Sequence, residues 1–320
     1  MERQPSRLAD RQRSAAMIRF PKSYVSYAVA AVNSSNLDDR LSFEDYIGSC
    51  MQRDPTQAIE NRRRECPNWP DEWLEGHVRF RWISDHNGWL TRGVARRIVS
   101  GDFDELQLFL EMHVQMHVRS RFLWYSNYAK NQEEFLEIWP LLVALAINDR
   151  STIQRHTEFA TFPLVKSRGG EPARLFNAVH LLLREPTSTK IADLDLRTSK
   201  STASWLKGCL EFIEACVRHD PTMAQNAFDA IVDGYRKSSQ INLMEKAIAF
   251  CAHGLLRVAE RVSPGLQVSH PTGASLPWDA ELHAAAANRE LLSRDHFPGV
   301  PSWLVNSFVD LRPLPWPPHN

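Results

Sequence analysis

The feature that most constrains this chain is a long segment, residues 102–128, in which apolar side chains recur every three or four positions. One stripe of it consists of Leu106, Leu110, Val114, Val118, Phe122 and Tyr125, and a second face carries Leu108, Phe109, Met112, Met116 and Leu123. This periodicity predicts one helix from Asp102 to Tyr128, with Asp102 and Glu105 as a capping pair at its start. A helix that is apolar around most of its circumference is enclosed by other helices. We therefore expect an all-α protein built in layers around this helix.

The same periodicity, interrupted by polar pairs, prolines and glycines, predicts the remaining helices. They are expected at residues 41–51, 55–64, 72–84, 89–99, 133–147 with a kink at Pro140, 151–159, 173–184, 203–218, 222–236, 243–262, 278–292 and 303–309. No confident pair of strands is found in the sequence. The short turns favour antiparallel neighbours, so the expected fold is an irregular stack of antiparallel helical hairpins.

Composition also suggests how the chain is divided. The expected parts are a flexible Arg-rich arm at 1–22, an N-terminal helical part at 23–185, a Thr- and Ser-rich linker at 186–202, a C-terminal helical part at 203–310 and a Pro-rich tail at 311–320. The two helical parts could also form one domain, because the chain is short enough for either arrangement.

Charge and cysteine usage narrow the class of protein. The 320 residues include 38 Lys and Arg and 38 Asp and Glu, so the net charge is zero, which disfavours a nucleic-acid partner. The cysteines are Cys50, Cys66, Cys209, Cys216 and Cys251. An odd number without CxxC spacing is typical of free thiols in a reducing compartment. The chain lacks a signal-peptide pattern, and its longest apolar run (141–147) is too short to cross a bilayer, so we expect a cytoplasmic protein without membrane partners.

Candidate catalytic and metal-binding residues are few. The sequence contains no GxSxG, P-loop or GxGxxG motif, and we expect no cofactor. His113 and His117 are four residues apart and could face one metal ion, but Val114 stands where a zinc-protease helix carries its glutamate. Structural, partly buried histidines are therefore the favoured interpretation. The cysteines of the second half share helix faces with core residues, where a thiol packs as a small apolar group. We expect no catalytic and no metal site.

Tryptophan and arginine alternate in residues 62–97, which we single out as the candidate partner-binding segment. Its candidate contact residues are Arg62, Arg63, Arg64, Trp69, Trp73, Arg79, Arg81, Trp82 and Trp89, and Arg92, Arg96 and Arg97 continue the pattern. These two residue types dominate the energetic hot spots of protein interfaces. The same mixture also serves nucleic-acid stacking. In a third interpretation the tryptophans fill gaps between helices and the arginines cover outer faces.

The second half of the chain resembles a known family. The run from Trp139 to Asp149, the hairpins from Trp205 to Val262 and the loop leading to Trp278 resemble immunity proteins of bacterial polymorphic toxin systems, in the family numbered forty-nine. This resemblance rests on helix rhythm and on a few Trp, Ala and Asp positions. It implies an all-helical, non-catalytic protein that binds a cognate secreted toxin inside the cell and neutralises it. It carries over no functional residue. The alternatives are a helical-repeat scaffold that recognises peptides and a helical enzyme whose site is assembled from distant residues.

Overall fold

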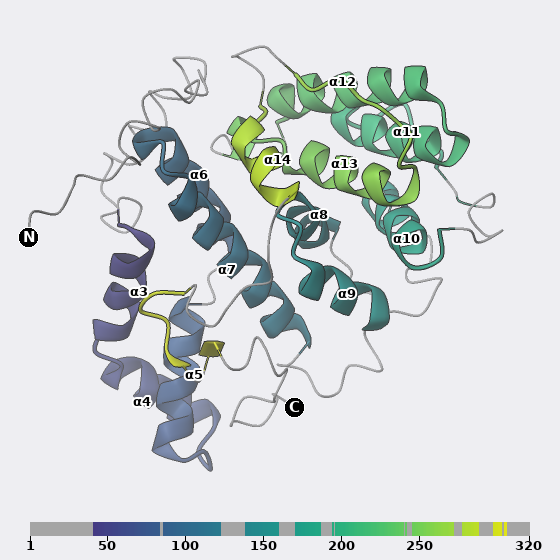
Figure 1. The fold of residues 1–320 in the computed structure, drawn as a ribbon. Helices are drawn as coiled ribbons and strands as arrows, with labels where there is room; N and C mark the ends of the chain where they lie inside the picture. The colour runs from purple at the N-terminus through teal and green to yellow at the C-terminus, as the bar shows by residue number, and fades with distance from the viewer. Residues whose placement is uncertain are drawn as a thin grey trace, which may run out of the picture.

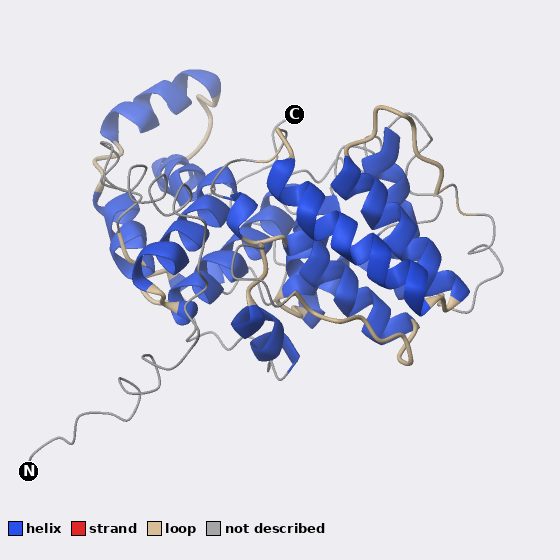
Figure 2. Cartoon of the chain, turned by 90° about the horizontal axis from the view of Figure 1, so that it is seen from above, coloured by secondary structure: helices blue, strands red, loops and turns tan. Residues whose placement is uncertain are grey.

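A computed structural model describes most of the helical part of the chain. It covers residues 41–83, 86–122, 138–159, 170–186, 194, 196–239, 241, 245–271, 277–287, 297–302, 304 and 305. Every regular element within these residues is helical, which confirms the predicted all-α class (Figures 1 and 2). None of the helices among the described residues combines the length and the apolar character needed to span a bilayer. The expected N-terminal arm and Pro-rich tail lie outside the described residues.

The helices follow the chain in short connected pairs. Their bounds are α3 (Phe43–Gln52), α4 (Thr56–Glu65), α5 (Asp71–Ile83), α6 (His86–Ser100), α7 (Phe103–Phe122), α8 (Ile138–Ala146), α9 (Arg150–Phe159), α10 (Gly170–Arg184), α11 (Ser204–Arg218), α12 (Pro221–Lys237), the 3₁₀ turn η6 (Glu245–Ala247), α13 (Phe250–Val262) and α14 (Ala280–Ala287). The most extensive helix contacts are α11 with α12, α13 with α8, and α6 with α7. Two of these three pairs are neighbours along the chain, as expected for helical hairpins.

Helix α7 is the predicted central helix, and it lies between two hydrophobic cores. Leu106, Leu110 and Val114 belong to the larger core, and Phe109, Met112 and Met116 belong to the smaller one. All six side chains are completely buried. A helix with one partner layer would leave half of these residues in water, so the two cores explain why α7 is apolar on opposite faces. The last residues of the expected helix, 123–128, lie outside the described part.

The smaller core joins helices from the first part of the described chain to residues from its last part. It contains residues of α3, α5, α6 and α7 together with Phe297, Leu304 and Val305. The larger core is formed mainly by α8 and α10–α13, with one face of α6 and α7, and Figure 1 shows these two helices between the two groups. Leu194 and Leu196, from the expected linker, pack against the larger core. That core therefore draws residues from both sides of 186–202, and the division into domains stays a prediction.

Polar caps fix several helix starts. Asp220 accepts a hydrogen bond from the Met223 amide at 2.9 Å, with Pro221 in the first turn of α12. Asp102 accepts a hydrogen bond from the Glu105 amide at 3.1 Å, as the sequence predicts. The Glu105 carboxylate turns elsewhere and accepts a hydrogen bond from the Phe43 amide at 2.8 Å. Asp102 therefore caps α7 as predicted, whereas the Glu105 side chain joins the start of α7 to the start of α3.

The predicted helix at 243–262 is wrong for residues 245–249. The chain forms the 3₁₀ turn η6 and then begins α13 at Phe250. The Ala249 amide donates to the Pro277 carbonyl at 2.8 Å, which replaces a bond within a continuous helix. The apolar pattern was nevertheless informative, because five of the apolar residues in this range, Ile248, Cys251, Ala252, Leu255 and Val258, are all buried. Pro140 lies in the first described turn of α8, and the residues before it that the expected kink concerns lie outside the described part.

Candidate functional site

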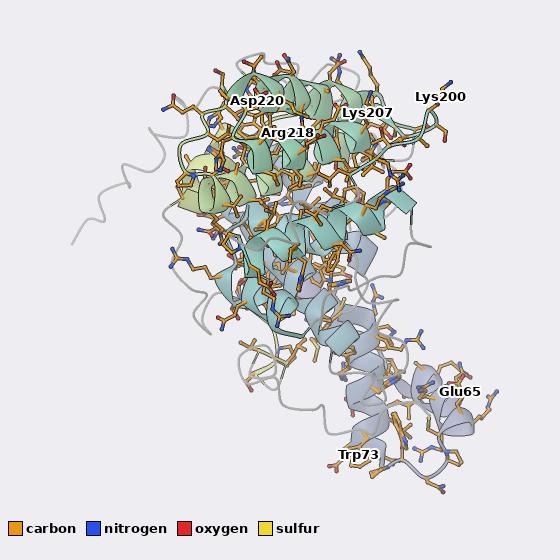
Figure 3. All side chains as sticks on the ribbon, turned by 90° about the vertical axis from the view of Figure 1, so that its right-hand side faces the viewer. Glu65, Trp73, Lys200, Lys207, Arg218 and Asp220 are labelled. Atoms are coloured by element: carbon orange, nitrogen blue, oxygen red, sulfur yellow. The ribbon has the colours of Figure 1, made fainter. Side chains whose placement is uncertain are left out.

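The first candidate surface is the hairpin formed by α4 and α5, residues 56–83. Helix α4 contains no buried residue, and its principal contact is with α5. Figure 3 shows Glu65 and Trp73 at the end of the molecule that lies far from Lys207 and Asp220. The hairpin therefore presents most of α4 to solvent. A helix that contributes nothing to a core and yet carries aromatic neighbours is a candidate for contact with another molecule.

Aromatic side chains gather at the turn of this hairpin. The rings of Trp69 and Trp73 meet edge to face, with centroids 6.5 Å apart at an angle of 80°. The guanidinium of Arg62 lies 5.6 Å from the centre of the Trp69 ring, and the His77 ring meets Trp69 edge to face with centroids 5.5 Å apart. Both tryptophans are only half-buried, although they also pack against the smaller core. Each therefore combines a fixed position with an accessible edge, which is favourable for an interface anchor.

The arginines of the hairpin are largely balanced by acidic neighbours. Arg62 pairs with Glu65, Arg63 pairs with Asp71 at 2.6 Å, and Arg79 pairs with Glu75 at 2.7 Å. Residues 53–83 contain six arginines and six acidic residues in total. Arg63, Arg64 and Arg81 are exposed. A surface with mixed charges creates no strong positive field of the kind that attracts a phosphate backbone.

Trp89 does not belong to this surface, and its assignment to a partner-binding face is wrong. Its side chain is completely buried in the smaller core, and its indole N–H donates to the Ile83 carbonyl at 2.8 Å. It contacts Phe43, Tyr46 and Phe109, with a Tyr46 centroid distance of 5.0 Å. Because this tryptophan fills the space between α3, α6 and α7, it serves the fold.

Several other residues of the segment 62–97 also serve the fold. Trp82 is half-buried against the smaller core, and Arg79 donates to the Met51 carbonyl and to Glu75. Arg92 and Arg97 are each 9% exposed, and the Arg92 guanidinium lies 4.1 Å from the centre of the Tyr46 ring. The candidate contact surface is thus confined to the hairpin and ends before α6.

The structure places the candidate metal and nucleophile residues in the core. His113 and His117 are 8% and 3% exposed on α7. Within the part of the chain that the structure describes, no three His, Cys, Asp or Glu side chains are arranged to hold a metal ion. Burial, together with the neighbouring Cys251, raises the pKa of Cys209 well above its ordinary value, and burial raises the pKa of Cys216 to about 12. These thiols stay protonated and are poor nucleophiles at neutral pH.

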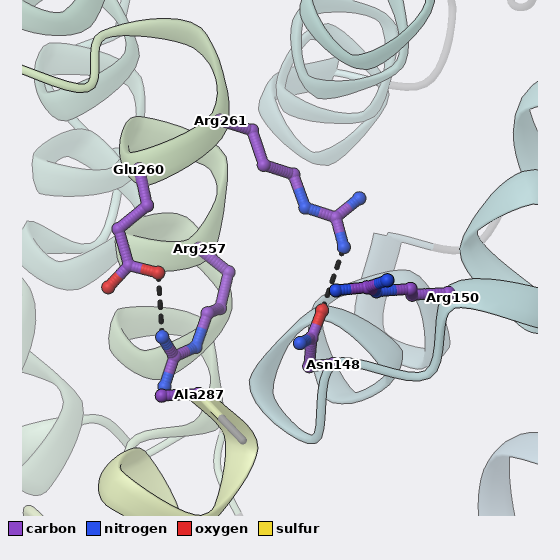
Figure 4. Close-up of a pocket in the computed structure, with 6 residues that line it drawn as sticks. All are labelled: Asn148, Arg150, Arg257, Glu260, Arg261 and Ala287. Atoms are coloured by element: carbon purple, nitrogen blue, oxygen red, sulfur yellow. Dashed lines mark hydrogen bonds and ion pairs between the residues drawn. The ribbon is translucent and has the colours of Figure 1, made fainter. Parts of the chain in front are cut away.

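A second candidate site is a pocket that the sequence did not indicate. It has a volume of about 660 Å³ and is lined by Asn148, Arg150, Arg257, Glu260, Arg261 and Ala287 (Figure 4). We call it the arginine pocket. The turn between α8 and α9 supplies one wall, the last turns of α13 supply the second, and the end of α14 closes the third. Arg150 lies more than 100 residues before Arg257 and Arg261 in the chain, so only folding brings the three arginines together.

Hydrogen bonds hold two of the three guanidinium groups in place. Arg261 donates to the Asn148 side-chain oxygen at 2.8 Å, and the Asn148 amide donates to the Ala286 carbonyl at 2.9 Å. Asn148 adopts a left-handed conformation (φ 53°), which this residue type tolerates better than most. Arg257 pairs with Glu260 at 2.6 Å and also donates to the His283 carbonyl. The pocket wall is therefore ordered by the protein itself.

Positive charge in the arginine pocket exceeds negative charge. The pKa of Arg261 is lowered, first by the partial loss of water around its guanidinium and then by repulsion from Arg150 and Arg257, while Glu260 acts in the opposite direction. Arg150 is exposed at the start of α9, and among the described residues it has no ion-pair or hydrogen-bond partner. The spacing of Arg257 and Arg261, four residues apart, places both on one face of a helix, but nothing in the sequence brings Arg150 to them.

Comparisons of this chain with protein-family models, with curated proteins and with solved structures found no match. The resemblance to the immunity proteins therefore stays a prediction.

Proposed function

We propose that this protein acts by stoichiometric binding of a protein partner and performs no chemistry of its own. The most specific form of the proposal is an immunity protein that covers the active site of a cognate bacterial toxin inside the cell. The observation that carries the proposal is the α4–α5 hairpin, in which a helix without any buried residue stands beside two half-buried tryptophans. Tryptophan and arginine are residue types that commonly anchor protein interfaces.

The chemistry of the remaining chain is compatible with a binding role. The buried cysteines of α11 have raised pKa values, and His113 and His117 lie within the packing of α7. The paired charges of the hairpin favour a partner with its own mixture of acidic and basic groups. Such a surface supplies specificity, because each ion pair has to be exchanged for an equivalent contact in the complex.

The experiment identifies the partner and then tests the hairpin. Tagged protein is used to capture partners from its host, and the candidate is purified and titrated against the chain by calorimetry. Arg64→Glu changes an exposed side chain that has no partner among the described residues, so it should leave folding unchanged and weaken the complex. Trp73→Ala should weaken it by about 2 kcal/mol, roughly 30-fold in Kd.

The matched control is Arg218→Ala at the opposite end of the molecule, where Arg218 is exposed and pairs only with Glu214 of its own helix (Figure 3). This variant should bind like the parent. Thermal unfolding of each variant separates lost contacts from lost folding. If Arg64→Glu and Trp73→Ala both fold and bind like the parent, the hairpin is not the contact surface.

A further inference from the structure

We propose that the arginine pocket binds the phosphate monoester group of a small soluble ligand. The site is separate from the α4–α5 hairpin, and the inference does not depend on the proposed partner-binding function. The first argument is charge. The pocket is lined by three arginines and one carboxylate, that of Glu260. A phosphate monoester carries about 1.5 to 2 negative charges at neutral pH, which matches this excess better than a single carboxylate does.

The second argument is the buried state of Arg257. Its residue is only 5% exposed, and its Nε–H has no hydrogen-bond partner within the described residues. Its terminal nitrogens are already held by Glu260 and by the His283 carbonyl. A buried donor without an acceptor costs free energy. The Nε atom is covered by protein, so an anion in the pocket acts on Arg257 through the charge of its guanidinium, which pairs with Glu260.

The third argument is the preorganisation of the other two arginines. Arg261 is oriented by Asn148, and Arg150 is the first residue of α9, where the positive end of the helix dipole adds to the field. The acidic cap of α9, Asp149, is not among the residues that line the pocket. Asp149 is 5% exposed and accepts hydrogen bonds from Gln115 at 2.9 Å and from Thr152, away from the residues that line the pocket.

Arginine also suits phosphate in geometry. Its planar fork offers parallel N–H groups to two phosphate oxygens, and Arg150 and Arg261 have N–H groups that can be shared by one phosphate group, while Arg257 adds its charge. The volume of about 660 Å³ falls within the range of roughly 300–1,000 Å³ typical of small-molecule sites. A phosphate group alone fills only part of that space. The ligand class is therefore a phosphorylated small molecule, with its phosphate between α13 and the start of α9.

The test is calorimetric titration of the full chain at constant ionic strength with AMP, inorganic phosphate and adenosine. AMP should bind, inorganic phosphate should compete with it, and adenosine should not bind. Arg150→Gln and Arg261→Gln should each weaken AMP at least about tenfold, the loss expected for one charge-assisted hydrogen bond. Arg150 is exposed and unpaired among the described residues, so Arg150→Gln should keep the parental melting temperature.

The matched control is Lys207→Gln at the start of α11, which removes the same charge from an exposed position. It should bind AMP like the parent. The inference is overturned if AMP gives no binding at millimolar concentration, or if both arginine variants bind it like the parent. It is also overturned if a dinucleotide with one phosphodiester and free hydroxyl ends binds as tightly as AMP, because that ligand carries no monoester.

Discussion

Arg97 and Asp279, which are 182 residues apart in the chain, form a buried ion pair with two hydrogen bonds. Arg97 Nε lies 2.9 Å from Asp279 Oδ2, and Arg97 Nη2 lies 3.3 Å from Oδ1. Burial works against the charge of Arg97, but Asp279 and Glu281 outweigh it, so the pKa of Arg97 is raised. Asp279 also accepts hydrogen bonds from the amides of Glu281 and Leu282 and so caps α14. One carboxylate therefore joins α6 to the start of α14.

Asp279→Ala should destabilise the protein by about 3–5 kcal/mol, because it leaves the Arg97 charge without its buried partner. Urea unfolding followed by circular dichroism measures the change. The control is Glu281→Gln, since Glu281 is half exposed and should contribute less than about 1 kcal/mol. Equal unfolding midpoints for Asp279→Ala and the parent would show that the ion pair does not hold α14 in place.

Met116→Asp should unfold the protein or destabilise it by more than about 4 kcal/mol, because Met116 is completely buried in the smaller core. The control is Gln57→Asp, which places the same side chain in the exposed first turn of α4 and should change stability by less than about 0.5 kcal/mol. Thermal melting distinguishes the two. A Met116→Asp variant that melts with the parent would place α7 outside the core.

Two glycine substitutions should have opposite effects. A Cβ at Gly254 would lie 2.5 Å from the Leu142 carbonyl oxygen, so Gly254→Ala forces α13 away from α8 and should cost about 1–3 kcal/mol. A Cβ at Gly48 meets nothing within 4 Å, and Gly48→Ala within α3 should stabilise by about 0.5–1 kcal/mol. Chemical denaturation measures both. The packing of α13 on α8 is wrong if the two variants shift stability in the same direction.

Acidification should destabilise the protein through histidines around Trp278. The His253 ring stacks on Trp278 with centroids 3.8 Å apart, and His270 and His283 meet at 4.3 Å. The pKa of His253 lies well below its ordinary value because of burial and then of His283, Arg257 and His270. The pKa of His283 is lowered to about 4 by burial and then by Arg257 and His270. Both rings are therefore neutral in the folded protein at neutral pH.

The unfolded chain protonates these histidines near their ordinary pKa of 6.5, whereas the folded protein resists protonation. The contribution of these two histidines to the free energy of unfolding is complete above pH 6.5 and is lost as the pH falls towards 4. A fully buried group contributes a slope of about 1.4 kcal/mol per pH unit in this window. Urea unfolding at pH 7.5, 6.0 and 5.0 measures it, and His253→Phe should reduce the slope. Equal stability at pH 7.5 and 5.0 would contradict this account.

Helices with clear local signals could be predicted from the sequence. The α11–α12 hairpin follows from the apolar stripe of each helix and from Asp220-Pro221, where Asp220 caps α12 and Pro221 is its first residue. The start of α13 could not be predicted in this way. It depends on the hydrogen bond from Ala249 to Pro277, a contact between distant residues, and the local pattern alone favours an uninterrupted helix.

The candidate sites were less predictable. Trp89 has the same arginine-rich surroundings in the sequence as Trp69, yet one is core and the other half-exposed. The difference arises from which helix face meets α3 and α7, and the alternation of tryptophan and arginine does not encode it. The arginine pocket was missed because Arg150 joins Arg257 and Arg261 only in the folded chain. The sequence shows only that Arg257 and Arg261, four residues apart, share one face of their helix.

The most direct test of the account is the stoichiometry of inhibition. Increasing amounts of this protein are added to a fixed amount of the purified partner, at concentrations far above the Kd, and the activity of the partner is measured. The account predicts a linear loss of activity that ends at one molar equivalent, with intact partner recovered when the complex is dissociated. Complete inactivation by a small fraction of an equivalent, or a covalently altered partner, would show that the protein acts as an enzyme and would contradict binding as its mode of action.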